Sequence, residues 1–169
     1  MRQQSVAFKL KVQGWSDSGK LSSFTAQFDR NGVLLNPQTV ANSRQFGWGK
    51  WQTSIKVPCS YGDCWWVSTP GHGGFILVTQ HKDLPKFKEP ARNVNCSYGG
   101  KVYYFAVYEF EEDCDWAILE YSDPKVQEFM RNRHNAWEHV SPKSQEEWME
   151  MILQTLRSWN PSFIQEVAS

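Results

Sequence analysis

The stretch from Val102 to Phe110 constrains the fold more than any other part of the sequence. Nearly every side chain in it is apolar or aromatic, and the pattern leaves no helical gap. A run of this kind, rich in Val, Tyr and Phe, is typical of a strand that is buried on both faces. We therefore expect residues 102–110 to form the central strand of a sheet.

A short helix is predicted directly after this strand. Cys114, Ala117, Ile118 and Tyr121 fall at positions i, i+3, i+4 and i+7, which places them on one helical face. Asp113 has the residue type and the position of an N-cap. Cys114 is expected to be a small buried core residue.

Five carboxylates crowd the junction between the strand and the helix: Glu109, Glu111, Glu112, Asp113 and Asp115. Carboxylates near a helix N-terminus offset its positive end, so part of the cluster has a structural explanation. Five exceed what one cap requires, and crowded like charges raise pKa values in the way that general acids and metal sites need. Both interpretations stay open, and the last four residues are candidate catalytic carboxylates.

A glycine-rich loop, Thr69-Pro70-Gly71-His72-Gly73-Gly74, stands out earlier in the chain. Its glycines permit backbone conformations closed to other residues, and they clear space around His72. A histidine placed in this way can act as an acid, a base or a ligand near neutral pH. We expect His72 to lie beside the carboxylates of residues 111–115 and name it as a candidate catalytic residue.

The first half of the chain is predicted to consist of strands and turns. Residues 36–52 and 81–95 look irregular, the second as a long surface loop. Asn31-Gly32 is a strong hairpin signal, so the residues after it are expected to pair back on the strand before it. The expected strands of this half are residues 5–12, 24–28, 33–35, 64–68 and 75–79.

Helices are predicted to follow. Asp123-Pro124 ends the first and opens a second, with helical spacing over residues 126–137. Ser141-Pro142 opens a last helix with a capping box at Ser144 and Glu147 and a buried stripe along one face. Asn160-Pro161 is expected to stop it and leave a loose tail.

Strands first and helices after them indicate an α+β fold, an antiparallel sheet of hairpins with C-terminal helices packed on it. The length suits a single domain over residues 1–169. Within it we distinguish an N-terminal β and irregular part (1–62), a motif-bearing core (63–140) and a C-terminal helix and tail (141–169).

The net charge of zero conceals two oppositely charged halves. Residues 1–100 hold twelve Lys and Arg against five Asp and Glu, and residues 101–169 hold six against thirteen. A basic half suits nucleic acid or an acidic partner, although the two halves can also attract each other. No apolar run approaches the ~20 residues that cross a bilayer, and no signal-peptide core is present. We expect a cytoplasmic protein without a membrane partner.

Cysteines and tryptophans raise two further possibilities. Cys59 and Cys64 have a loose zinc-ligand spacing, but the histidines that would complete the set lie about 70 residues away on different helical faces, so no metal site is expected. Trp48 and Trp51 lie among Gly and Lys, as stacking rings do in single-strand nucleic-acid binders. The alternative is that both rings cover the edge of a small core.

Two motifs together resemble an uncharacterised family found in bacteriophages and mobile elements. That family carries a T-P-x-H-G-G element followed by a W-Y-E-E-D-C-x-W-A element, and the resemblance covers about residues 65–137. Phe110 is an extra residue relative to the second element. The resemblance implies a genomic setting and supplies no mechanism. The matching residues are Thr69, Pro70, His72, Gly73, Gly74, Tyr108, Glu109, Glu111, Glu112, Asp113, Cys114, Trp116 and Ala117.

Such a setting favours a protein that binds a host protein or protein complex and inhibits host defence. On this hypothesis Trp48, Trp51 and the acidic residues Glu146, Glu147 and Glu150 are candidate binding residues. The alternative is a hydrolase or transferase using His72 with a carboxylate of residues 111–115. A third possibility is a nucleic-acid-binding protein. No nucleotide-binding loop, zinc-protease helix or serine-elbow motif is present, and no cofactor is expected.

Overall fold

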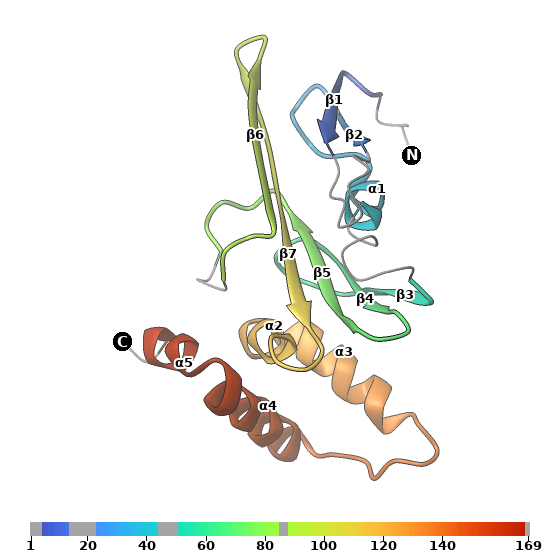
Figure 1. Ribbon diagram of the computed structural model, residues 1–169, viewed down its shortest axis with the longest axis vertical. Helices are drawn as coiled ribbons and strands as arrows, with labels where there is room; N and C mark the ends of the chain where they lie inside the picture. Colours follow the sequence, from blue (N-terminus) through green and yellow to red (C-terminus); the bar gives the residue numbers. More distant parts are fainter. Residues whose placement is uncertain (1–4, 14–22, 44–50, 85–87, 168–169) are drawn as a thin grey trace.

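The computed structural model describes residues 5–13, 23–43, 51–84 and 88–167 and has the predicted α+β fold (Figure 1). No helix in these ranges is long and apolar enough to cross a membrane. The elements in chain order are β1 (Phe8–Gln13), β2 (Ser23–Phe28), α1 (Pro37–Asn42), β3 (Thr53–Val57), β4 (Asp63–Ser68), β5 (Gly73–Thr79), β6 (Arg92–Tyr98), β7 (Lys101–Glu111), α2 (Trp116–Ser122), α3 (Pro124–Asn135), α4 (Gln145–Trp159) and α5 (Pro161–Val167).

The main sheet has five antiparallel strands in the order β3-β4-β5-β7-β6. The expectation that residues 102–110 form the central strand is therefore wrong by one position, because β5 is central and β7 lies beside it. Every residue of β5 is buried, whereas β7 is buried on both faces only in its middle and leaves Val102 53% exposed.

Two apolar cores lie on the two faces of this sheet. Alternate residues of a strand point to opposite faces, so β5 sends Phe75 and Leu77 into one core and Ile76 and Val78 into the other. Helices α2 to α5 cover the first face, and β1, β2 and α1 cover the second. The double burial explains why β5 shows no polar alternation in its sequence.

The N-terminal strands β1 and β2, both expected from the sequence, form a separate antiparallel pair. β1 pairs with β2 from Phe8 opposite Phe28 to Gln13 opposite Ser23. After the Asn31-Gly32 turn, Leu34 forms an isolated antiparallel β-bridge with Phe28. The strand expected over residues 33–35 is therefore reduced to this one bridge. Part of the stretch expected to be irregular is instead the short helix α1.

Gln80 joins the N-terminal unit, which consists of β1, β2, the turn after β2 and α1, to the main sheet by hydrogen bonds. Its side-chain oxygen accepts a hydrogen bond from the Leu34 backbone N–H at 2.7 Å. Its side-chain nitrogen donates to the carbonyl oxygens of Gly32 and Tyr104 at 2.8 and 3.0 Å. One amide group thereby satisfies backbone groups of both parts.

The long loop expected over residues 81–95 is shorter than predicted, because β6 begins at Arg92. β6 and β7 form a hairpin closed by Gly99 and Gly100, whose φ angles are 56° and 73°. Two adjacent positive φ angles define the turn that best matches strand twist, and glycine adopts them without steric cost. Strand β3 was also not expected from the sequence.

The helices follow the predicted order, with corrections at two ends. α2 begins at Trp116 with Asp115 in the N-cap position, so Asp113 is not the cap. Cys114 is half-buried instead of buried, and burial followed by the neighbouring Asp115 raises the pKa of its thiol. Asp123 caps α3 by accepting from the Lys125 N–H at 3.0 Å.

The capping box of the long helix α4 is confirmed. Ser144 accepts from the Glu147 N–H at 3.2 Å, and Glu147 accepts from the Ser144 N–H at 2.8 Å. The expectation of a loose tail after Asn160-Pro161 is wrong. Pro161 opens α5, which buries Phe163 against the helix-side core.

Candidate functional site

The glycine-rich loop and the acidic junction are neighbours in the fold. Gly74 of β5 pairs with Glu111 of β7, and the Glu112 N–H donates to the Gly73 carbonyl oxygen at 3.0 Å. The antiparallel register therefore joins the two motifs that stand out in the sequence, although 35 residues or more separate them in the chain.

Close packing at this junction explains the two adjacent glycines. A Cβ atom at Gly74 would lie 2.0 Å from the carbonyl oxygen of Phe110, and the φ angle of Gly74 is 136°. A Cβ atom at Gly73 would lie 2.3 Å from the Glu112 carboxylate oxygen Oε2. A larger residue at Gly74 would push β5 and β7 apart, whereas one at Gly73 would have to displace the Glu112 carboxylate.

Thr69 fixes the conformation of the loop that carries His72. The Thr69 hydroxyl donates to the His72 carbonyl oxygen at 2.7 Å and accepts from the His72 N–H at 3.0 Å. The His72 side chain is exposed. Among the described contacts, none joins its imidazole to a carboxylate, so a catalytic pair with residues 111–115 stays a prediction.

The four candidate carboxylates have different surroundings. Glu111, Glu112 and Asp113 are exposed, whereas Asp115 is half-buried and forms an ion pair with Lys88. The ion pair gives Asp115 a structural role at the start of α2, where it occupies the N-cap position without a side-chain cap hydrogen bond. Glu112 is the member that reaches a cavity.

This cavity, which we call the crevice, lies between the end of the main sheet and helices α3 and α4 and has a volume of about 450 Å³. A cavity of this size accommodates a small ligand or one large side chain. Three indole rings and a thioether supply much of its wall. The lining residues are Thr53, Trp66, Ser68 and Glu112 from the sheet side and Met130, Arg133, His134, Trp137 and Trp148 from the helix side.

Polar groups are distributed around these rings. The Thr53 and Ser68 hydroxyls are hydrogen-bonded to each other at 2.6 Å. The His134 ring lies 5.2 Å from the Trp148 ring, and its Nε2 atom is 3.4 Å from the Ser141 carbonyl oxygen. Glu112 and Arg133 bring opposite charges to the same cavity, and within the described ranges no ion pair involves either side chain.

A buried carboxyl group holds the indole of Trp148 in place. Trp148 Nε1 donates to Glu120 Oε2 at 2.8 Å, and Glu120 is only 1% exposed. Burial raises the pKa of Glu120 to about 8, while the hydrogen bond from Trp148 opposes part of that rise. At neutral pH the carboxyl group is therefore mostly protonated, which avoids an unpaired buried charge.

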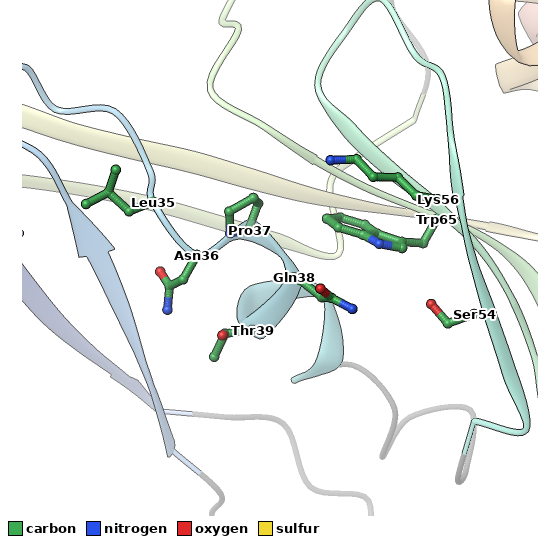
Figure 2. A pocket seen from close by; sticks show the side chains of 8 residues that line it. All are labelled: Leu35, Asn36, Pro37, Gln38, Thr39, Ser54, Lys56 and Trp65. Carbon is green, nitrogen blue, oxygen red and sulfur yellow. The ribbon is translucent and has the colours of Figure 1, made fainter. Parts of the chain in front are cut away.

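A second cavity, of about 550 Å³, separates α1 from strands β3 and β4 on the opposite face of the sheet (Figure 2). Lys56 lies over the Trp65 ring at 5.7 Å and forms an ion pair with Asp63 at 2.7 Å. The Asn36 amide is occupied with Gln27 and Thr25 of β2. These polar groups already have partners, so the crevice is the stronger candidate for ligand binding.

The candidate binding residues named from the sequence are dispersed. Trp48 lies outside the described residues. Trp51 is half-buried and packs against the core that the sheet forms with β1, β2 and α1. This contact agrees with the alternative interpretation, in which the ring covers the edge of a core. Glu146, Glu147 and Glu150 are exposed on α4. Glu147 belongs to the capping box and Glu150 pairs with Arg157 at 3.3 Å. A hydrogen bond with its own backbone, followed by one from Ser144, lowers the pKa of Glu146.

Within the described ranges, no three His, Cys, Asp or Glu side chains gather in a way that could hold a metal ion. Cys64 is buried, and burial followed by its contact with Cys59 raises the pKa of its thiol. His134 lines the crevice and His139 is exposed.

Sequence reasoning missed the crevice. The helical spacing of residues 126–137 does not single out Arg133, His134 or Trp137. Their proximity to Trp66 and Glu112 depends on where α3 packs against the sheet, which no local pattern encodes. Three of the nine tryptophans line this one cavity, and that abundance was the available signal.

Comparison with known proteins finds no similar protein among those with curated descriptions and no similar solved structure. The model of one protein family matches residues 42–167, about three quarters of the chain. This segment contains the five-stranded sheet, the crevice and helices α2 to α5, whereas β1, β2 and most of α1 precede it. The chain thus belongs to the family described as domain of unknown function (DUF7007).

Proposed function

We propose that this protein acts by binding a host protein or protein complex in the cytoplasm, and that the crevice receives an aromatic side chain of that partner. The supporting observation is the wall of three indole rings and a thioether around a cavity of about 450 Å³. Aromatic anchors packed in such pockets dominate the affinity of many protein interfaces. Glu112 can accept a hydrogen bond from a tyrosine hydroxyl or an indole N–H at the edge of the ring.

Trp137 is the residue through which this proposal is best tested, because it is 58% exposed and lines the crevice. Trp159 on α4 is a matched control, since it is 66% exposed and does not line the crevice. We expect Trp137→Ala to weaken partner capture from host lysate at least about tenfold, as loss of an interface anchor does. We expect Trp159→Ala to have little effect. Equal capture by both variants would exclude the crevice as the anchor site.

Intact-mass measurement of the captured protein separates binding from catalysis. An inhibitor retains its partner unmodified and at equal stoichiometry. The resemblance of the two motifs to proteins of bacteriophages and mobile elements supports a partner that belongs to host defence, with inhibition as the consequence of binding. A captured partner with no role in defence would reject this narrower form of the proposal.

A hydrolase or transferase is the second candidate, favoured by the hydrogen bond between Gly73 and Glu112 that brings the His72 loop to the acidic junction. His72 would act as the acid or base with a carboxylate of residues 111–115. In that case His72→Ala or Asp113→Ala abolishes modification of the partner while binding persists. His81→Ala is the control, because His81 is also exposed and lies outside the two motifs. Modification that continues unchanged in the His72 and Asp113 variants would reject the enzyme.

A further inference from the structure

Three aromatic rings form a stacked column at the end of the molecule opposite helices α2 to α5 (Figure 1). The Tyr103 and Phe8 ring centroids are 4.3 Å apart with an interplanar angle of 27°. Phe8 and Tyr98 continue the stack at 4.9 Å and 25°. Exposure increases along the column, from 5% at Tyr103 to 64% at Tyr98. The column therefore starts in the core and ends in a ring that is open to solvent.

The last ring belongs to a projecting part of the fold. Tyr98 is the final residue of β6, and the β6–β7 hairpin extends beyond the other strands of the sheet (Figure 1). Tyr98 pairs with Lys101 across the turn, so both side chains lie on the same face of the hairpin. The Lys101 ammonium donates to the Arg30 carbonyl oxygen, which brings the β2 turn against the hairpin.

Positive charge dominates this end. Residues 5–13, 23–43 and 92–104 hold five basic side chains and one acidic side chain, a net charge of +4. The acidic residue, Asp29, is only 5% exposed and accepts hydrogen bonds from the Asn31 and Val33 N–H groups. Arg92 is half-buried and donates to the Gln13 carbonyl oxygen at 2.6 Å. Four exposed cations remain, namely Lys9, Lys11, Arg30 and Lys101.

We propose that this basic tip, formed by Tyr98, Lys101 and Arg30, binds single-stranded nucleic acid. An unpaired base stacks on the exposed ring of Tyr98 and extends the aromatic column, while the cations contact phosphates. Aromatic platforms beside basic side chains are the usual means of binding single strands without sequence preference. An acidic protein surface would use the cations but would gain less from a ring held parallel to a stack.

Fluorescence anisotropy with fluorescein-labelled dT12 at low salt tests the proposal on the full chain. Tyr98→Ala should raise the dissociation constant at least about fivefold, the effect of losing one stacked base, and Tyr98→Phe should preserve binding. Lys101→Gln should weaken binding and reduce the slope of log K against log salt by about 0.7, because one phosphate contact is lost. Lys125→Gln, which removes an exposed cation from α3, is the control and should change neither quantity.

Three results would overturn the proposal: no binding of dT12, equal binding by Tyr98→Ala and wild type, or tighter binding of a duplex of the same length. Poly-glutamate that competes as well as unlabelled dT12 would point to an acidic protein as the ligand instead. The Trp137→Ala variant should bind dT12 normally, so failure of the crevice and failure of the basic tip are distinguishable. Circular dichroism of Tyr98→Ala verifies that the fold is retained.

Discussion

At the scale of single residues, the carboxyl group of Glu120 is expected to control how stability depends on pH. Its pKa of about 8 in the folded protein lies well above the ordinary value of 4.5. Between these values the folded protein holds a proton that the unfolded chain has released, so raising the pH favours unfolding. Stability should fall by about 1.4 kcal/mol per pH unit from this group over that interval.

Glu120→Gln should remove this slope, because the amide cannot ionise and still offers an oxygen to Trp148. Urea unfolding at pH 5.5 and 7.5 measures the effect. Wild type should lose about 2 kcal/mol more than the variant between the two pH values. Glu128→Gln is the control, since Glu128 is an exposed carboxylate on α3. Identical pH dependence in wild type and Glu120→Gln would contradict the assignment.

Gly74 offers a second test at this scale. An alanine there would meet the Phe110 carbonyl oxygen at 2.0 Å and would have to adopt a positive φ angle. We expect Gly74→Ala to destabilise the protein by about 2 kcal/mol or more, as strained backbone positions do. Gly71→Ala is the matched control, because a Cβ atom at Gly71 meets nothing within 4 Å. Similar melting temperatures for the two variants would show that β5 and β7 do not pack as closely at Gly74 and Phe110 as the structure has them.

At the scale of elements, α5 is the helix whose contribution to the free energy of unfolding is easiest to measure. Phe163 is buried among helix-side core residues and lies 6.0 Å from the Tyr121 ring in an edge-on arrangement. Phe163→Ala should cost about 3–5 kcal/mol, the usual effect of removing a buried phenyl group. Gln165→Ala, an exposed change in the same helix, should have little effect. Chemical denaturation gives both values, and a neutral Phe163→Ala would mean that α5 does not pack on the core.

The elements predicted well from the sequence are those with a local cause. The Ser144–Glu147 capping box and the start of α3 at Asp123-Pro124 depend on neighbouring residues alone, and both appear as expected. Two errors have a local origin as well. The polar residues 81–95 indicate a loop, whereas the Gly99-Gly100 turn makes residues 92–98 a hairpin strand. Asn160-Pro161 is typical of a helix stop, but proline also suits a first helical turn.

Features that depend on register or packing were less predictable. The periodicity of residues 102–110 indicates a buried strand but cannot place it one position from the centre of the sheet. The pairing of Gly74 with Glu111 brings the glycine-rich loop to the acidic junction, while the expected proximity of the His72 side chain to the carboxylates stays a prediction. The crevice was not expected, because Trp66 and Trp148 meet only after α4 has packed against the sheet.

At the scale of the whole molecule, attachment of the N-terminal unit to the sheet depends on Gln80. Its side chain makes three hydrogen bonds, to Leu34, Gly32 and Tyr104. We expect Gln80→Ala to leave three backbone groups without these partners and to destabilise the protein by about 1–3 kcal/mol. Hydrogen exchange should accelerate at Leu34 first. Gln52→Ala, an exposed change before β3, is the control. Unchanged exchange at Leu34 would assign the attachment to apolar packing and to the hydrogen bonds that Arg92 and Lys101 donate to Gln13 and Arg30.

The β6–β7 hairpin has a consequence for the order in which the chain folds. Its pairs run from Tyr98 opposite Lys101 to Arg92 opposite Val107, so all of its contacts are between residues close in the chain. Hairpins of this kind close in about 1–10 μs, whereas pairing of β5 with β7 must first close a longer loop. We expect this hairpin to form early and to present β7 as the template on which β5 assembles. Replacing Gly99 and Gly100 with alanine should then slow refolding more than it accelerates unfolding.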